Sequence, residues 1–149
     1  MTQRIYLDAC CLNRPFDDQT QGRIRLETEA LVHLLRAVEE GKVVWVASDA
    51  VAAEISRCPD EIRRSAVEAL LARATERGSL SKEVLDRAKV LRSFGLKDFD
   101  AMHLALAEAA GVTVLVTTDD RFIAAAGRLG PPSAVRVLNP VALAAELLQ

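Results

Sequence analysis

The sequence predicts an α/β fold, a three-layer α/β/α sandwich built around a central parallel sheet. Two observations predict it. Short runs of β-branched and other apolar residues alternate with longer segments whose apolar residues recur at helical spacing. The run at residues 43–47 is apolar throughout, as expected for a strand that helices cover on both faces. The 149 residues have the length of one domain, so we expect a single domain over residues 1–149.

Four strands are expected from short apolar runs, of which the third is the richest in β-branched residues. In chain order they occupy residues 4–8, 43–47, 112–118 and 134–138. The last two strands and the short helix between them form a βαβ unit, which is right-handed in nearly all proteins. Parallel strands joined by helices therefore account for most of the chain.

The expected helices have periodic apolar residues and recognisable ends. Gly41 stands where a glycine ends a helix, Ser48 is an N-cap residue, and Pro140 occupies an accepted first-turn position. In chain order the helices cover residues 22–40, a segment after Ser48 that carries Glu54, and residues 60–77, 81–93, 98–110, 119–128 and 140 onward. A minimal sheet does not need the helices at 60–77 and 81–93, so we expect them to form a protruding helical pair.

Composition excludes several classes of protein. Half of the residues are hydrophobic and 27% are charged, which is typical of a folded protein, and the net charge of −2 argues against non-specific polyanion binding. No apolar run approaches the roughly 18 residues that span a bilayer. The first residues lead directly into a strand, and the three cysteines form no CxxC motif. We therefore expect a cytoplasmic protein without a signal peptide or a membrane partner.

Four acidic residues are expected at one edge of the sheet. Asp8 and Asp119 follow predicted strands, so both lie at the carboxyl ends, where open α/β sheets bind ligands. Asp100 lies in the first turn of the helix at 98–110, which must begin at that same edge. Glu54 lies about six residues, roughly 9 Å, into its helix, but its side chain points back toward the helix start.

Clustered carboxylates repel one another and resist ionisation unless a cation neutralises them. A cluster of oxygen ligands suits Mg²⁺ or Mn²⁺ rather than zinc. Taken singly, Asp98 and Asp119 are also candidate N-caps, and Glu54 a solvated helix residue. Asp120 is either a further metal ligand or a first-turn helix acid.

Other polar residues are candidates for supporting roles. His103 lies one helical turn after Asp100, and we favour a packed, hydrogen-bonded core residue over a general acid. Arg14 and Arg121 are candidate substrate-binding residues because each is close in sequence to a proposed metal-binding aspartate. Residues 57–92 carry nine basic and six acidic residues, suited either to phosphate contacts or to an ordinary solvated face. With only 4% aromatic residues, a base-stacking platform is not expected.

The chain resembles the PIN-domain nucleases, and among them the VapC-like toxins of toxin–antitoxin pairs, from end to end. The matching segments are Ile5-Tyr6-Leu7-Asp8, Val51-Ala52-Ala53-Glu54-Ile55, Gly95-Leu96-Lys97-Asp98-Phe99-Asp100-Ala101-Met102-His103-Leu104-Ala105 and Leu115-Val116-Thr117-Thr118-Asp119-Asp120-Arg121-Phe122. The last two segments are the specific ones.

The resemblance implies a metal-dependent endoribonuclease whose acids correspond to Asp8, Glu54, Asp100 and Asp119. It also implies products with 5′-phosphate and 3′-hydroxyl ends, a homodimer, and a protein antitoxin that occupies the cleft. The chain departs from the family at Ala9, where Thr or Ser often follows the first aspartate and supports the site. Asn13 is a candidate substitute.

Alternative functions remain open at this stage. A housekeeping RNA-processing nuclease, or an inactive PIN fold that serves as an RNA-binding or interaction module, fits the same fold. A haloacid-dehalogenase-like phosphatase is disfavoured because it needs a second acid where Cys10 stands. A receiver domain is disfavoured because it needs paired acids near the first strand.

Overall fold

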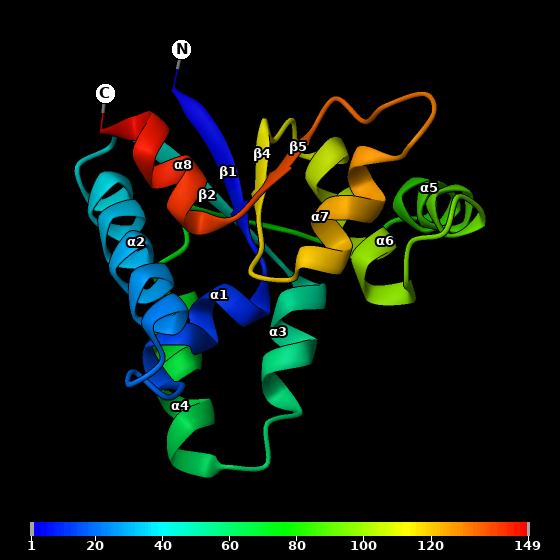
Figure 1. Ribbon diagram of the computed structural model, residues 1–149. Helices are drawn as coiled ribbons and strands as arrows, with labels where there is room; N and C mark the ends of the chain where they lie inside the picture. Colours follow the sequence, from blue (N-terminus) through cyan, green and yellow to red (C-terminus); the bar gives the residue numbers. More distant parts are fainter. Residues whose placement is uncertain (1, 149) are drawn as a thin grey trace.

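A five-stranded sheet organises the structure, a computed structural model that describes residues 2–148. Its strand order is β3-β2-β1-β4-β5, and all four neighbouring pairs are parallel (Figure 1). The strands are β1 (Gln3–Leu7), β2 (Val43–Ser48), β3 (Glu76–Gly78), β4 (Val114–Val116) and β5 (Arg136–Leu138). The helices are α1 (Ala9–Asn13), the 3₁₀ turn η1 (Arg14–Phe16), α2 (Gly22–Glu39), α3 (Asp49–Ser56), α4 (Glu61–Leu71), α5 (Lys82–Ser93), α6 (Asp98–Ala109), α7 (Asp120–Gly127) and α8 (Pro140–Leu147).

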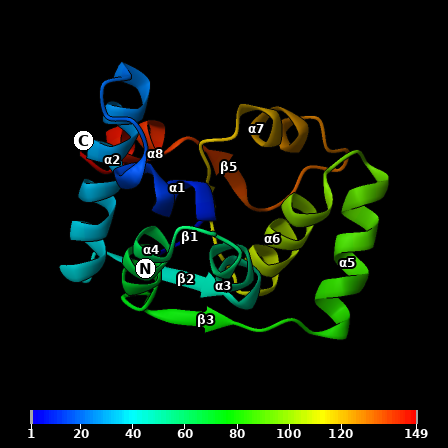
Figure 2. The same ribbon diagram turned by 90° about the horizontal axis from the view of Figure 1, so that it is seen from below.

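Helices cover both faces of this sheet, as Figure 2 shows. Helices α2 and α8 pack together on one face, while α6 covers the other face with α5 packed outside it. The predicted three-layer α/β/α sandwich is confirmed. Within residues 2–148, no helix combines the length and the apolar character that a bilayer crossing requires.

Strand β1 lies at the centre of the sheet and defines the position of the site. Ile5, Tyr6 and Leu7 are fully buried because β2 and β4 flank the strand and helices cover its faces. Leu7 pairs in register with Val116, the last residue of β4. The residues that follow both strands therefore emerge side by side at the carboxyl edge, the edge of the sheet where the strands end.

Local sequence signals explain the helix ends. Gly41 and Gly111 follow α2 and α6 with φ angles of 73° and 69°, in the left-handed region that glycine adopts without strain. The Ser48 side chain accepts a hydrogen bond from the backbone N–H of Val51 and so caps α3, as predicted. Pro140 occupies the first turn of α8, also as predicted.

Two elements differ from the expectation for residues 60–93. The helix predicted over residues 60–77 ends at Leu71, and Glu76–Gly78 instead forms the edge strand β3, which pairs with β2. Its residues are two charged side chains and a glycine, so no alternation of apolar residues indicates a strand. Pairing with β2, a contact remote in sequence, determines its conformation.

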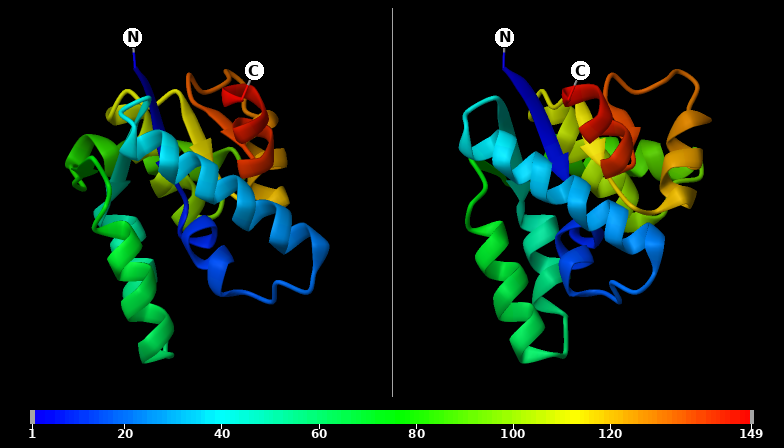
Figure 3. Two further views of the ribbon diagram at one scale, coloured as in Figure 1. Left: turned by 90° about the vertical axis from the view of Figure 1, so that its left-hand side faces the viewer. Right: turned by 60° about the vertical axis from the view of Figure 1, so that its left-hand side comes forward.

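The protruding helical pair is present, but α3 and α4 form it rather than residues 60–77 and 81–93. Helices α3 and α4 extend beyond the carboxyl edge of the sheet (Figures 1 and 3), whereas α5 packs along α6. Packing inside the domain buries Val67, Leu71, Val84 and Leu91. These four apolar residues of the predicted pair therefore belong to the core.

Candidate active site

Asp8 lies at the carboxyl edge of the sheet and is only 7% exposed. It follows β1 and caps α1, a short helix that the sequence analysis did not predict. Its Oδ1 accepts a hydrogen bond from the backbone N–H of Ala9 at 2.8 Å, and its Oδ2 accepts one from the hydroxyl of Thr117 at 2.9 Å. These two bonds hold the carboxylate in one orientation.

The Thr117 hydroxyl supplies the polar group that Ala9 lacks. It donates to Asp8 and accepts from the backbone N–H of Asp119 at 3.1 Å, so one buried hydroxyl contacts both acid-bearing segments. The Asn13 side chain, the predicted substitute, instead donates to the backbone carbonyl of Ala9 at 3.0 Å. The support comes from the neighbouring strand, which single-sequence reasoning did not place beside Asp8.

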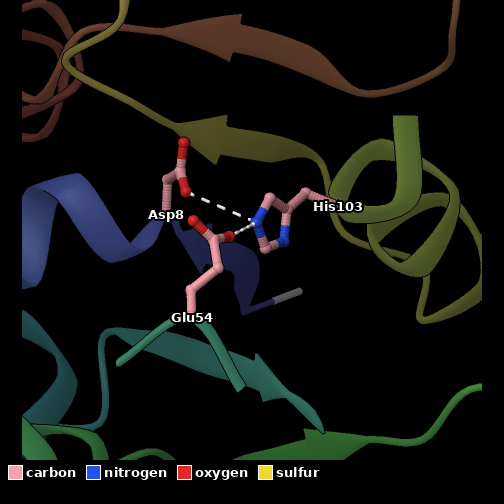
Figure 4. Close-up of side chains that lie close together, drawn as sticks. All are labelled: Asp8, Glu54 and His103. Atoms are coloured by element: carbon pink, nitrogen blue, oxygen red, sulfur yellow. Dashed lines mark hydrogen bonds and ion pairs between the residues drawn. The ribbon is translucent and has the colours of Figure 1, made fainter. Parts of the chain in front are cut away.

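Glu54 reaches the site from the α3 side, as Figure 4 shows. Its carboxylate contacts Nε2 of His103, and the same nitrogen lies 3.6 Å from Oδ1 of Asp8. Ligand atoms of Asp8, Glu54 and His103 all lie within 4.8 Å of one another, close enough to hold one metal ion. We call these three residues the three-residue cluster.

His103 is buried and hydrogen-bonded, as predicted, but it also belongs to this cluster. Its Nδ1 lies 2.6 Å from the hydroxyl of Tyr6, which lies 2.5 Å from the hydroxyl of Ser48. Burial alone would lower the pKa of His103, but the hydrogen bond to Glu54 and the nearby acids raise it. The spacing of three residues from Asp100 was the sequence signal for a role at the site.

Asp100 lies in the first turn of α6 and Asp119 caps α7. Burial raises the pKa of Asp100 to about 6, and the negative charges of Asp8 and Asp119 add to the increase. This coupling places Asp8, Asp100 and Asp119 in one electrostatic site, although Asp100 and Asp119 lie outside the three-residue cluster. The N-cap interpretation of Asp119 is confirmed, since its side chain accepts from the backbone N–H of Arg121 at 2.9 Å.

The charge balance of this site fits a bound cation. Burial raises the pKa of Asp8, with a further increase from Glu54 and a decrease from His103. Several carboxylates thus share the edge with one imidazole, and without further positive charge they resist ionisation together. A divalent ion would relieve this repulsion, and the oxygen and nitrogen atoms present are suitable ligands.

Two other acids next to the site have partners of their own. Both carboxylate oxygens of Asp120 accept hydrogen bonds from Arg23 at 2.8 Å, and this pairing lowers the pKa of Asp120. The N-cap interpretation of Asp98 is wrong, because Lys97 occupies that position of α6. Asp98 instead pairs with Arg92 at 3.3 Å.

The candidate substrate-binding arginines have different surroundings. Arg14 donates to Glu27 and to Asp17, each at 2.9 Å, so carboxylates already occupy much of its guanidinium. Arg121 is exposed and lines a cavity of about 290 Å³ together with Asp100, Lys97 and Arg128. Within residues 2–148, none of these three cations pairs with a carboxylate.

Comparisons with known proteins agree with this arrangement. The family model of the PIN domain matches residues 5–128. A search of curated proteins returned no match.

Similar solved structures include a chain of VapBC2 from Rickettsia felis bound to a promoter DNA fragment, with a TM-score of 0.64 and 16% identity over 92% of this chain and 98% of that chain. VapC20 of Mycobacterium tuberculosis, described as a toxin that cleaves the sarcin–ricin loop, has a TM-score of 0.59 and 15% identity over 81% of this chain and 94% of that chain. A chain of DNA-bound VapBC from Salmonella typhimurium has a TM-score of 0.60 and 14% identity over 94% of this chain and 99% of that chain. At these identities the likeness establishes the fold.

Proposed function

Because this chain belongs to the PIN domain family, we propose that it is a metal-dependent endoribonuclease that acts as the toxin of a toxin–antitoxin pair. The observation that carries the proposal is the set of acids at the carboxyl edge, where the charges of Asp8 and Asp119 act on Asp100 and Glu54 joins Asp8 through His103. Its metal is Mg²⁺ or Mn²⁺, and its substrate is RNA.

The chain's own residues have distinct tasks in this reaction. When bound, the divalent ion acidifies a water molecule and neutralises charge on the phosphate oxygens. Asp8, Asp100 and Asp119 would hold the ion, directly or through water. Glu54, with a side chain that is 29% exposed, would complete the set of ligands or orient the attacking water. The water oxygen forms a new bond to phosphorus, the bond to the 3′ oxygen breaks, and that oxygen takes up a proton.

Substrate phosphates next to the reacting one need positive charge. The cavity beside Asp100 offers Lys97, Arg121 and Arg128, whose charges are not neutralised by carboxylates of the described residues. The Arg57 guanidinium carbon lies 5.2 Å from the ring centroid of Phe99, the residue that precedes Asp100. These cations supply sequence-independent affinity for the RNA backbone, so binding should weaken as salt increases.

A toxin of this kind needs a protein inhibitor, and two of the similar structures are described as VapBC. We extend the proposal to a protein antitoxin that covers the acidic site and to a homodimer of this chain. The end of α5 supports an interaction surface, since Val90 on the helix and Phe94, which directly follows it, are 45% and 52% exposed one turn apart. Sedimentation of the purified chain, alone and with the product of a neighbouring reading frame, tests both partners.

RNA cleavage by Asp100→Asn, with Asp98→Asn as its matched control, tests the activity. Both acids lie in the first turn of α6, but only Asp100 shares the site. We expect Asp100→Asn to lower the cleavage rate at least about 100-fold and Asp98→Asn to leave it within about threefold. EDTA should stop cleavage by the wild type and Mn²⁺ should restore it. Cleavage that persists after complete chelation would contradict metal dependence.

A further inference from the structure

We propose that His103 supplies a nitrogen ligand to the metal ion, so that the ion is held by a mixed nitrogen and oxygen set rather than by carboxylates alone. This inference rests on the proposed metal-dependent function and identifies the ligand atom: Nε2 of His103. Asp8 provides the facing oxygen, and Glu54 completes the set.

The positions of the three side chains support a shared ion. Nε2 of His103 lies 3.6 Å from Oδ1 of Asp8. Two ligands that each lie about 2.1 Å from one ion are roughly 3.0 Å apart at right angles and roughly 4.2 Å apart on opposite sides. The observed separation falls between these limits. The direct contact between Glu54 and Nε2 is shorter than both, so this hydrogen bond must open before Nε2 can bind the ion. Figure 4 shows that Glu54 approaches the same nitrogen, so all three groups converge on one small volume.

Hydrogen bonds behind the imidazole prepare Nε2 for this task. The hydroxyl of Tyr6 binds Nδ1, and the hydroxyl of Ser48 binds Tyr6 in turn. All three side chains are at least 99% buried. Histidines that bind metals almost always have the second ring nitrogen fixed by such a partner, which sets the tautomer and the ring orientation. Ser48 also caps α3, so the chain of hydroxyls couples the imidazole to the helix that carries Glu54.

A competing role for His103 is an ion pair with Glu54 that positions this carboxylate without contact with metal. The ion pair would satisfy Glu54 and place a cation 3.6 Å from Oδ1 of Asp8, but it would supply only one positive charge for Glu54, Asp8, Asp100 and Asp119 together. Direct ligation lets one ion contact the imidazole and the acids together. The two roles make different predictions about the atoms bound to the metal.

A nitrogen ligand also changes the preference among metals. Imidazole suits transition metals, whereas Mg²⁺ favours oxygen ligands and near-ideal octahedral geometry. We therefore expect the full chain to bind Mn²⁺ more tightly than Mg²⁺, and His103→Gln to weaken Mn²⁺ binding by about 10- to 100-fold with a smaller effect on Mg²⁺. Isothermal titration of the metal-free protein with each ion measures these constants without reference to cleavage.

Pulsed electron paramagnetic resonance on the Mn²⁺-loaded protein gives the decisive test. The chain contains only two histidines, His33 and His103. His33 is exposed on α2 and is the matched control. We expect an imidazole ¹⁴N coupling to Mn²⁺ in the wild type and in His33→Gln, and its loss in His103→Gln. If His103→Gln fails to fold, the spectrum of His33→Gln decides alone, because His103 is then the only histidine present.

Other outcomes separate this inference from the proposed function. Mn²⁺ binding by the wild type without a nitrogen coupling would overturn ligation by His103 and leave the nuclease proposal intact. Failure of the wild type to bind any divalent ion would overturn both. Tyr6→Phe should retain the nitrogen coupling while lowering Mn²⁺ affinity by roughly tenfold, because it removes only the partner of Nδ1.

Discussion

Two buried carboxylates, Asp8 and Glu27, have opposite surroundings. Glu27 is 1% exposed, and its oxygens accept hydrogen bonds from Arg14 at 2.9 Å, from Arg23 at 3.3 Å and from Asn139 at 2.5 Å. Among residues 2–148, Asp8 accepts only from a backbone N–H and a threonine hydroxyl, and its nearest cationic partner is His103 at 3.6 Å.

The difference separates a structural acid from a functional one. Glu27 connects α2, η1 and the start of α8, and two guanidinium groups neutralise it within the folded chain. Burial raises the pKa of Asp8 and the nearby Glu54 adds to the increase, so the ionised form of Asp8 is less favourable. A protein retains such an arrangement at a cost in stability, so the uncompensated cluster is the place to expect a ligand from outside the chain.

The largest expected effect is on stability, and it has opposite signs at the two sites. Glu27→Ala should lower the free energy of unfolding by about 2 kcal/mol, because it leaves the partly buried Arg14 without its carboxylate. Arg14 and Arg23 are both partly exposed, so the loss should be smaller than for a fully buried ion pair. Asp8→Asn, measured in EDTA, should leave stability unchanged or raise it, because it removes a repelling charge. Urea unfolding measures both variants.

Glu29→Ala is the matched control for Glu27→Ala, since Glu29 is an exposed acid on the same helix. It should change stability by less than about 0.5 kcal/mol. Equal destabilisation by Asp8→Asn and Glu27→Ala would remove the distinction between the two carboxylates.

The sequence predicts the position of Asp8 but not that of Glu27. Asp8 and Asp119 were predicted at one edge because each follows an apolar run, and strand direction then brings them together. Glu27 has no such signal, because its partners Arg14 and Asn139 lie 13 and 112 residues away along the chain. Burial of an acid within a helix is decided by tertiary packing, which helical periodicity does not specify.

The same limit explains β3 and His103. Glu76–Gly78 becomes a strand only because β2 offers an edge, so local propensity did not reveal it. His103 was expected to be a packed core residue because it lies on a helix face beside the sheet, and it is one. Its second role depends on Tyr6 and Glu54, which meet it from β1 and α3. Periodicity predicted the elements, whereas contacts between distant segments determined the composition of the site.

The pH dependence of stability should show the uncompensated charge directly. The pKa of Asp100 is about 6 in the folded chain, against a usual value of 3.8. The folded protein therefore binds this proton more tightly than the unfolded chain does. The resulting stabilisation is fully present below about pH 3.8 and is lost as the pH rises through about 6.

Melting temperatures in EDTA between pH 4 and pH 7 measure this effect. The wild type should lose stability relative to Asp100→Asn as the pH rises, and Mn²⁺ should reduce that loss at pH 7 by binding the ionised form. Asp98→Asn, the exposed neighbour, should follow the wild type at every pH. Parallel curves for wild type and Asp100→Asn would mean that the folded site does not favour the protonated carboxyl.

The smallest effect is expected at Asp120, which adjoins Asp119 in sequence but, like Glu27, has an arginine partner that neutralises its charge. Its carboxylate pairs with Arg23, the same arginine that contacts Glu27, and its side chain is 68% exposed. Asp120→Asn should keep RNA cleavage within about threefold of the wild type and change the melting temperature little, because exposed ion pairs contribute little. Asp119→Asn, the neighbouring change, should lower cleavage at least about 100-fold. Equal losses at both positions would make Asp120 part of the metal site and would show that pairing with an arginine does not exclude an acid from function.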